Sequence, residues 1–86
     1  MQITTAAAIT AIVEAYGNRH GQYVRIAEIA ATTGLTREQL GDAITDLLDD
    51  EDFTAEPEPF GFRITPADRA AGPIIGGEAR HLIKWM

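Results

Sequence analysis

The stretch IAEIAATTGLTREQLGDAITDLLDD, residues 26–50, decides the fold of this chain. In its first part, Ile26, Ile29 and Ala30 recur at the spacing of one buried helix face. Gly34 follows, and glycine permits the positive φ of a tight turn. The first part therefore predicts a short helix that ends near residue 33 and is followed by a sharp turn.

The second part of the stretch predicts a longer helix. Thr36 is a capping residue, and Glu38 or Gln39 can return a hydrogen bond to it in the first turn. A buried stripe follows, made of Leu40, Ala43, Ile44, Leu47 and Leu48. Two helices across a glycine turn, with the small Ala30 where their axes cross, form a helix-turn-helix arrangement over about residues 25–50.

The charge of the chain is concentrated on this second helix. Seven of the 13 acidic residues lie between Thr36 and Phe53, where Arg37 is the only base. The other acidic and basic residues balance, so the net charge of −6 belongs to this helix and its exit. Any electrostatic argument about partners starts from this segment.

The flanking segments predict a mainly helical α+β domain. Before the stretch, Thr4 or Thr5 caps a helix whose apolar face includes Ile9, Ile12, Val13 and Tyr16, and Gln22 to Val24 are β-prone. After it, Phe53–Ala55 and Phe62–Ile64 predict a two-stranded hairpin whose tip is the sequence EPEP. Thr65, Pro66 and Asp68 then predict a helix start.

Length and composition predict one soluble, cytoplasmic domain spanning residues 1–86. The 45% hydrophobic and 23% charged residues are ordinary for a globular chain. Without cysteine there is no disulfide framework and no thiolate metal site. No apolar run approaches the roughly 20 residues of a membrane span, and the N-terminus does not resemble a signal peptide.

In its order of elements the chain resembles the winged helix-turn-helix superfamily of small DNA-binding domains. IAEIAATTGLTREQLGDAITDLL corresponds to the two-helix unit, DFTAEPEPFGFRIT to the wing at about residues 53–65, and ITPADRAAG to the segment after it. The resemblance implies a three-helix core with a short strand, a two-stranded β-hairpin wing and a C-terminal helical tail within residues 66–86.

The resemblance also implies a small DNA-binding transcriptional regulator that acts as a dimer. The helix at residues 36–50 would read the DNA groove, where base edges and phosphates mostly require donors. The residues expected to contact DNA are Thr36, Arg37, Gln39 and Thr45 in the groove, with Arg63 and Arg25, and also Arg19, on phosphates.

The acidic residues favour a second hypothesis. Asp42 and Asp46 would face a polyanion, and the wing tip carries Glu56 and Glu58. The alternative is a protein-interaction module on the same scaffold, which docks on a basic partner as an anti-regulator or DNA mimic. Its docking residues would be Asp42, Asp46, Asp49 and Asp50.

Aromatic and apolar side chains near the end of the chain predict a further surface. We expect Tyr23, Phe53 and Phe62 in the core. The tail carries Leu82, Ile83 and Trp85, which either pack back on the domain or form a dimer interface.

Enzymatic function is the least expected class, and no cofactor is predicted. No nucleophile is paired with a base, and no paired carboxylates suggest acid–base catalysis. His20 and His81 lack the neighbouring ligands of a metal site.

Overall fold

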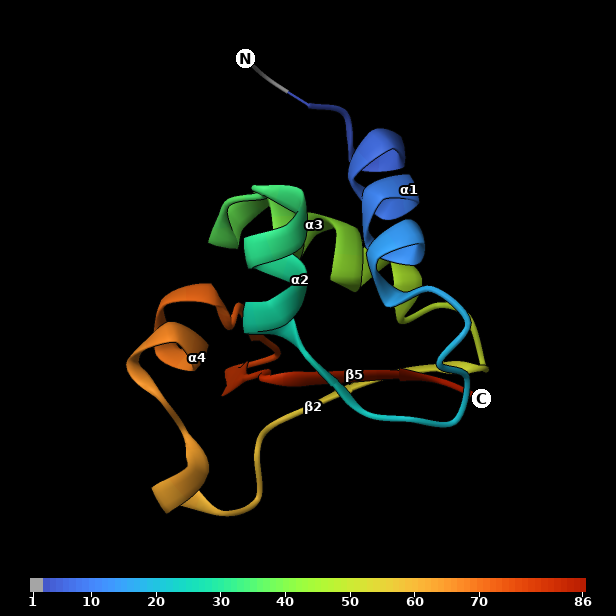
Figure 1. Ribbon diagram of the computed structural model, residues 1–86. Helices are drawn as coiled ribbons and strands as arrows, with labels where there is room; N and C mark the ends of the chain where they lie inside the picture. The colour runs from blue at the N-terminus through green and yellow to red at the C-terminus, as the bar shows by residue number, and fades with distance from the viewer. Residues whose placement is uncertain (1–2) are drawn as a thin grey trace.

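A computed structural model describes residues 3–86 as a small mixed domain in which helices cover one side of an antiparallel sheet (Figure 1). The helices are α1 (Thr5–Tyr16), α2 (Ile26–Thr33), α3 (Arg37–Leu47) and α4 (Pro66–Ala71). A 3-10 turn, η1 (Gly61–Arg63), lies in a loop that extends away from the body.

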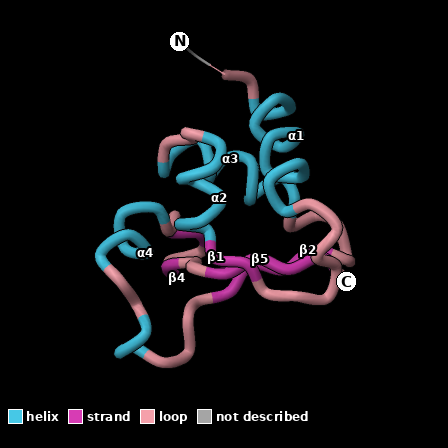
Figure 2. Tube along the Cα trace, in the orientation of Figure 1, coloured by secondary structure: helices cyan, strands magenta, loops and turns pink. Residues whose placement is uncertain are grey.

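The main sheet has three short strands in the order β1-β5-β2, all antiparallel (Figure 2). They are β1 (Val24–Arg25), β2 (Phe53–Glu56) and β5 (Leu82–Trp85). Ile83 of the central strand pairs with Val24 on one side and with Ala55 on the other. A separate hairpin joins β3 (Ile74–Ile75) to β4 (Glu78–Ala79) through Gly76 and Gly77, both at positive φ.

The helix boundaries follow from local side-chain chemistry. The backbone N–H of Ala7 donates to the Thr4 hydroxyl at the start of α1. Gly34 ends α2 in the left-handed conformation, at φ 75°. Thr36 and Gln39 form a complete capping box at the start of α3, as the sequence predicted.

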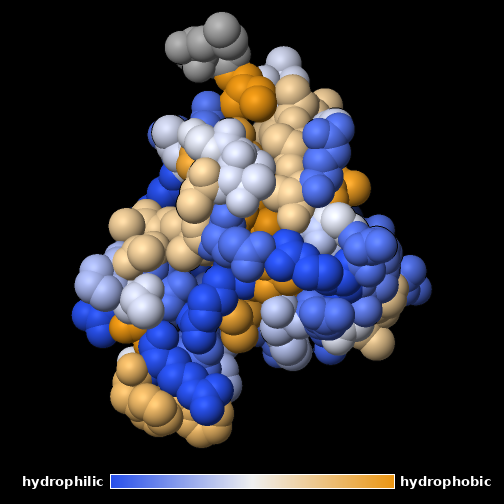
Figure 3. Space-filling view, viewed as in Figure 1, coloured by the Kyte–Doolittle hydropathy of each residue, from blue (hydrophilic) through white to orange (hydrophobic). Residues whose placement is uncertain are grey.

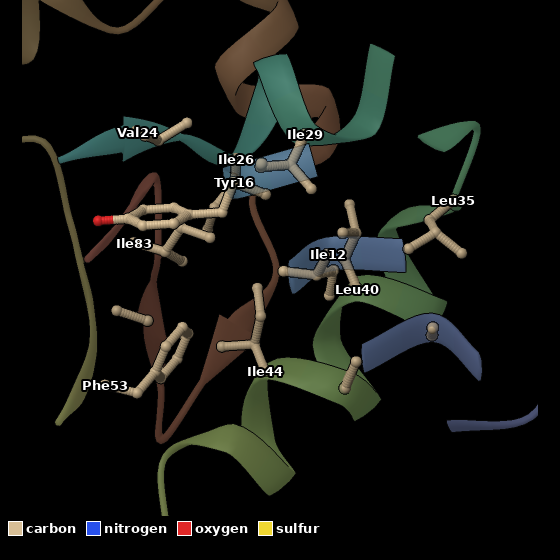
Figure 4. Close-up of a cluster of buried hydrophobic side chains, with 13 residues drawn as sticks. Ile12, Tyr16, Val24, Ile26, Ile29, Leu35, Leu40, Ile44, Phe53 and Ile83 are labelled. Atoms are coloured by element: carbon tan, nitrogen blue, oxygen red, sulfur yellow. The ribbon is translucent and has the colours of Figure 1, made fainter. Parts of the chain in front are cut away.

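The core lies between the sheet and the first three helices (Figure 4). Its largest fully buried apolar side chains are Ile12, Tyr16, Ile26, Ile29, Leu40, Ile44 and Ile83. They come from α1, α2, α3 and β5, so every layer of the fold contributes to one continuous core.

The predicted hairpin between Phe53–Ala55 and Phe62–Ile64 is wrong. β2 pairs with β5 instead, and Phe62 and Arg63 lie in η1. The physical reason is Ile83, which fills the space between Val24 and Ala55 and is fully buried there. The Phe62 region has no comparable inward-facing residue flanked by partners on both sides.

The predicted helical tail is confirmed at α4, which begins with the expected Thr65 cap and Pro66, and is wrong for the rest of the segment. Residues 74–86 form β3, β4 and β5. Two consecutive positive-φ glycines, Gly76 and Gly77, turn the chain sharply, and the β-branched residues on either side favour strands.

Three side chains expected in the core are not buried there. Phe62 is 84% exposed, Tyr23 is 49% exposed and Val13 is 48% exposed. Phe53 is buried as expected. Phe62 and Tyr23 are exposed because neither occupies an inward position of the main sheet.

Candidate functional site

The exposed face of α3 and the turn after it form an acidic face that lacks internal ion pairs. It is made of Glu38, Asp42, Asp46, Asp49, Asp50, Glu51 and Asp52. All seven side chains are exposed, and within residues 3–86 no cation forms a salt bridge with any of them. The charges of this acidic face are therefore open to solvent and to a partner.

Three polar side chains of α3 that were expected to face DNA form hydrogen bonds within the helix. The Thr36 hydroxyl accepts from the Gln39 backbone N–H at 3.1 Å, and the Gln39 side-chain oxygen accepts from the Thr36 N–H at 2.9 Å. The Thr45 hydroxyl donates to the Gly41 carbonyl at 2.7 Å. These three side chains complete the helix on which they lie.

Arg37 is tied to the segment after α4. Its Nε donates to the Gly72 carbonyl at 2.8 Å. Pro73 lies against Gly41, since a Cβ at Gly41 would come within 3.2 Å of the Pro73 Cβ. Ile74 completes the wall of a shallow hollow of about 390 Å³ beside Arg37 and Gly41. The first half of α3 is thus flanked by another part of the same chain.

Arg25 is held in two ion pairs. Its guanidinium lies 2.8 Å from the Glu58 carboxylate and 2.8 Å from the Asp68 carboxylate. Both carboxylates are buried, and Asp68 also accepts from the Thr65 N–H at 2.9 Å to cap α4. Arg25 therefore joins β1 to the loop after β2 and to α4.

A buried histidine adds a fourth member to this group. His81 Nδ1 accepts from the Glu58 backbone N–H at 3.0 Å, and His81 is only 6% exposed. Accepting requires a neutral imidazole with its proton on Nε2. We call Arg25, Glu58, Asp68 and His81 the polar lock, because together they fix the loop after β2 to the body.

Beyond the polar lock, the loop presents two aromatic side chains and one cation. Phe60 is 50% exposed and Phe62 is 84% exposed, with their rings 5.8 Å apart. The Arg63 guanidinium lies 5.0 Å from the Phe60 ring centre and 5.8 Å from that of Phe62. We call these three residues the aromatic tip; hydrophobic surface gathers at this lower end of the molecule in Figure 3.

A groove of about 610 Å³ adjoins the aromatic tip. Its lining is Tyr23, Arg25, Glu56, Pro57, Glu58, Pro59, Phe60, Arg63 and Leu82. This volume falls within the range of pockets that bind small molecules or large side chains. Phe62 is not part of the lining, although Phe60 and Arg63 are.

One wall of the groove carries a tyrosine with altered acidity. The Tyr23 hydroxyl donates to the Glu56 carboxylate. That hydrogen bond raises the pKa of the Tyr23 hydroxyl above its ordinary value of 10.0, because it stabilises the protonated phenol. The Lys84 ammonium lies 4.6 Å from the Tyr23 ring centre and partly opposes the shift.

Leu82, Ile83 and Trp85 pack within the domain. Ile83 is fully buried in the central strand, and the Trp85 ring lies 4.9 Å from Tyr16 and 4.6 Å from Phe53. The tail therefore packs back on the domain, which is the first of the two alternatives that the sequence left open. The dimer-interface role predicted for Ile83 is wrong, whereas Leu82 and Trp85 stay half-buried. Ile83 has no surface to offer a second copy.

Two findings concern other classes of function. Within residues 3–86 no group of three or more His, Cys, Asp or Glu side chains is placed to hold a metal ion. Among the same residues, none of the helices combines the length and apolar character needed to cross a membrane.

Sequence reasoning missed the polar lock and the aromatic tip. The Thr65–Asp68 cap was visible in the sequence, but the partners of Asp68 and Glu58 lie 43 and 33 residues away in the chain. A glutamate between two prolines was the one available signal that Glu58 has a structural role.

Comparison with known protein families found no family model that matches the chain, and no curated protein or solved structure matched it either.

Proposed function

We propose that this chain is a protein-interaction module on a winged-helix scaffold, which docks on a basic partner protein through the acidic face of α3. One observation carries the proposal. The polar side chains of α3 that were expected to contact DNA form hydrogen bonds inside the chain, whereas the acidic side chains of the same helix form no ion pairs within the described residues.

Electrostatics supports this choice. A DNA-binding surface gains most of its affinity from cations that neutralise phosphates. Here Arg25 is neutralised by Glu58 and Asp68, and Arg37 is tethered at the edge of α3. A row of unpaired carboxylates instead complements lysine and arginine side chains on another protein, and it speeds their encounter.

The winged-helix scaffold is part of the same proposal. The order of the three helices and the strand order β1-β5-β2, with β5 returning between its two neighbours, are consistent with it. In this reading the wing is an enlarged segment between β2 and β5, which contains η1, α4 and the β3–β4 hairpin.

The second candidate is the DNA-binding regulator that the resemblance implies. The element order favours it, and Thr36, Arg37, Gln39 and Thr45 do lie at the start and along the exposed side of α3. Fold analogy is a weaker argument than the chemistry of the site, so we place it second.

The test compares two variants that remove the same charge from different faces. Asp42→Asn/Asp46→Asn neutralises two carboxylates of the acidic face, and Glu14→Gln/Glu78→Gln neutralises two exposed carboxylates elsewhere. The probe is a synthetic peptide of mixed lysine and arginine content, and calorimetry measures its dissociation constant.

We expect the α3 variant to weaken peptide binding at least fivefold, and the control variant to change it less than twofold. Equal effects of the two variants would show attraction to net charge alone and would contradict docking on α3.

A further inference from the structure

The aromatic tip and the groove beside it have features that complement each other. Phe62 is a large apolar side chain left 84% exposed, and the groove is a hollow of about 610 Å³ lined by Tyr23, Pro57 and Leu82 among others. A projecting aromatic ring and an apolar hollow on one surface are the two halves of a contact. Phe62 does not fill the groove of its own chain.

Hydrogen bonds hold the backbone of the aromatic tip before any contact is made. The Phe60 N–H donates to the Glu58 carboxylate at 3.2 Å, and Glu58 is itself paired with Arg25. Within η1 the Arg63 N–H donates to the Phe60 carbonyl at 2.9 Å. Because the tip is already ordered, association requires little further loss of conformational freedom.

The same surface also carries one unpaired charge of each sign. The Arg63 guanidinium lies over the Phe60 and Phe62 rings, and Glu56 accepts from the Tyr23 hydroxyl. Neither residue forms a salt bridge with any other residue of the described chain, 3–86. Both border the groove.

We propose that this surface binds a second copy of the chain through a two-fold exchange. The Phe62 ring of each copy enters the groove of the other, and Arg63 of each copy pairs with the partner's Glu56. A two-fold interface requires that one patch be complementary to itself, and this patch holds both a ring and a hollow, and both a cation and a carboxylate.

The distribution of charge permits this association despite the net charge of −6. The acidic residues at the end of α3 lie near the C-terminus, since the Met86 N–H donates to the Asp52 carbonyl. In Figure 1 that end is on the right of the molecule, and η1 is at the lower left. In the dimer the acidic residues at the end of α3 and in the turn after it therefore lie away from the contact.

The contact is small, so a weak dimer is expected. An aromatic side chain contributes about 200 Å² when buried, and two copies of the tip and groove together approach the roughly 1,000 Å² of the smallest specific interfaces. We expect a dissociation constant of about 10 to 300 µM for this dimer at moderate salt.

Sedimentation equilibrium of the full chain across this concentration range is the first test. We expect a monomer–dimer equilibrium for the wild type, and a dissociation constant at least tenfold higher for Phe62→Ser. Val13→Ser, which changes an exposed apolar residue on α1, is the matched control and should dimerise like the wild type. A wild type that stays monomeric at 500 µM, or an unchanged Phe62→Ser dimer, would overturn the proposal.

A charge-swap experiment with two variants tests the ion pairs proposed between the copies. Arg63→Glu alone and Glu56→Arg alone each place like charges across the contact, so each variant should be monomeric. Their equimolar mixture restores both opposite-charge pairs, and only between unlike copies, so it should form a heterodimer. A mixture that remains monomeric would contradict the reciprocal pairing, whereas a folding defect in either variant cannot produce rescue on mixing.

This inference does not depend on the function proposed for α3. The α3 variant that loses binding to the basic peptide should still dimerise. Phe62→Ser, which should lose the dimer, should still bind the peptide through the acidic face.

Discussion

The role of Arg25 is set by its ion-pair partners in the folded chain. From the sequence it is an exposed base beside a helix, suited to a phosphate. In the structure it lies between the buried Glu58 and Asp68 carboxylates. A pair of this kind is difficult to break, because the remaining buried charge would have no partner. Arg25 therefore joins β1 to the loop after β2 and to α4.

The first prediction concerns the polar lock. Asp68→Ala removes one ion pair to Arg25 and the side-chain cap of α4. Since Arg25 is partly exposed and keeps Glu58, we expect a loss of about 2–3 kcal/mol in the free energy of unfolding, below the full cost of breaking a buried pair.

Urea denaturation followed by circular dichroism measures this loss. Asp46→Ala removes an exposed carboxylate without a salt bridge in the described chain and should change stability by less than about 0.5 kcal/mol. Equal stability of the two variants would contradict the polar lock.

A second prediction at the residue scale concerns pH. Because hydrogen bonding to Glu56 raises the pKa of Tyr23, the favourable interaction is fully present below pH 10 and is lost as the pH rises through the higher folded value. Glu56→Gln should return the Tyr23 pKa toward its ordinary value. The ¹³C chemical shift of the Tyr23 ring carbon that carries the hydroxyl, followed from pH 8 to 12, measures both values. A midpoint unchanged by the substitution would contradict the assigned cause.

At the scale of elements, β5 is the strand on which the sheet depends. It pairs with both β1 and β2, although it lies at the end of the chain. The two helices α2 and α3 and the turn between them could be predicted from residues 26–50, because caps, a glycine turn and apolar spacing are local signals. The pairing of β2 with β5 could not, since it joins residues about 30 apart and depends on how well Ile83 fits the core.

Ile83→Ala tests the importance of this strand. Removal of a fully buried isoleucine side chain should lower the free energy of unfolding by about 2–4 kcal/mol. Met86→Ala, at a residue that is 67% exposed one position beyond β5, is the control and should change it little. Thermal melting of both variants decides the outcome. A mild effect of Ile83→Ala on stability, together with a changed oligomeric state, would restore the dimer role first assigned to the tail.

The segment between α4 and β3 provides a second test at this scale. A Cβ on Gly72 would lie 2.6 Å from the Arg80 carbonyl and 2.9 Å from that of Asp68. Gly72→Ala should therefore destabilise the fold by about 1–3 kcal/mol through overpacking. Gly61→Ala is the matched control, since its Cβ would meet nothing within 4 Å and its φ is not positive. Equal melting temperatures would contradict the close packing at Gly72.

At the scale of the whole molecule, the chain has two distinct ends. One carries the end of α3 and the acidic turn that follows it, and the other carries the aromatic tip and its groove. The acidic end could be predicted from the sequence, because charge runs along one helix. The aromatic end could not, because Phe62 is exposed only as a result of β5 taking the place expected for residues 62–64.

The central claim is that α3 presents carboxylates to a protein and does not read DNA. Fluorescence anisotropy of a labelled mixed-sequence duplex, titrated with the full chain from about 20 to 200 mM salt, tests it most directly. We predict no change in anisotropy at any salt concentration for the wild type. Binding at 20 mM salt that weakens steeply as salt is added would reveal phosphate contacts, and would contradict the claim in favour of the DNA-binding regulator.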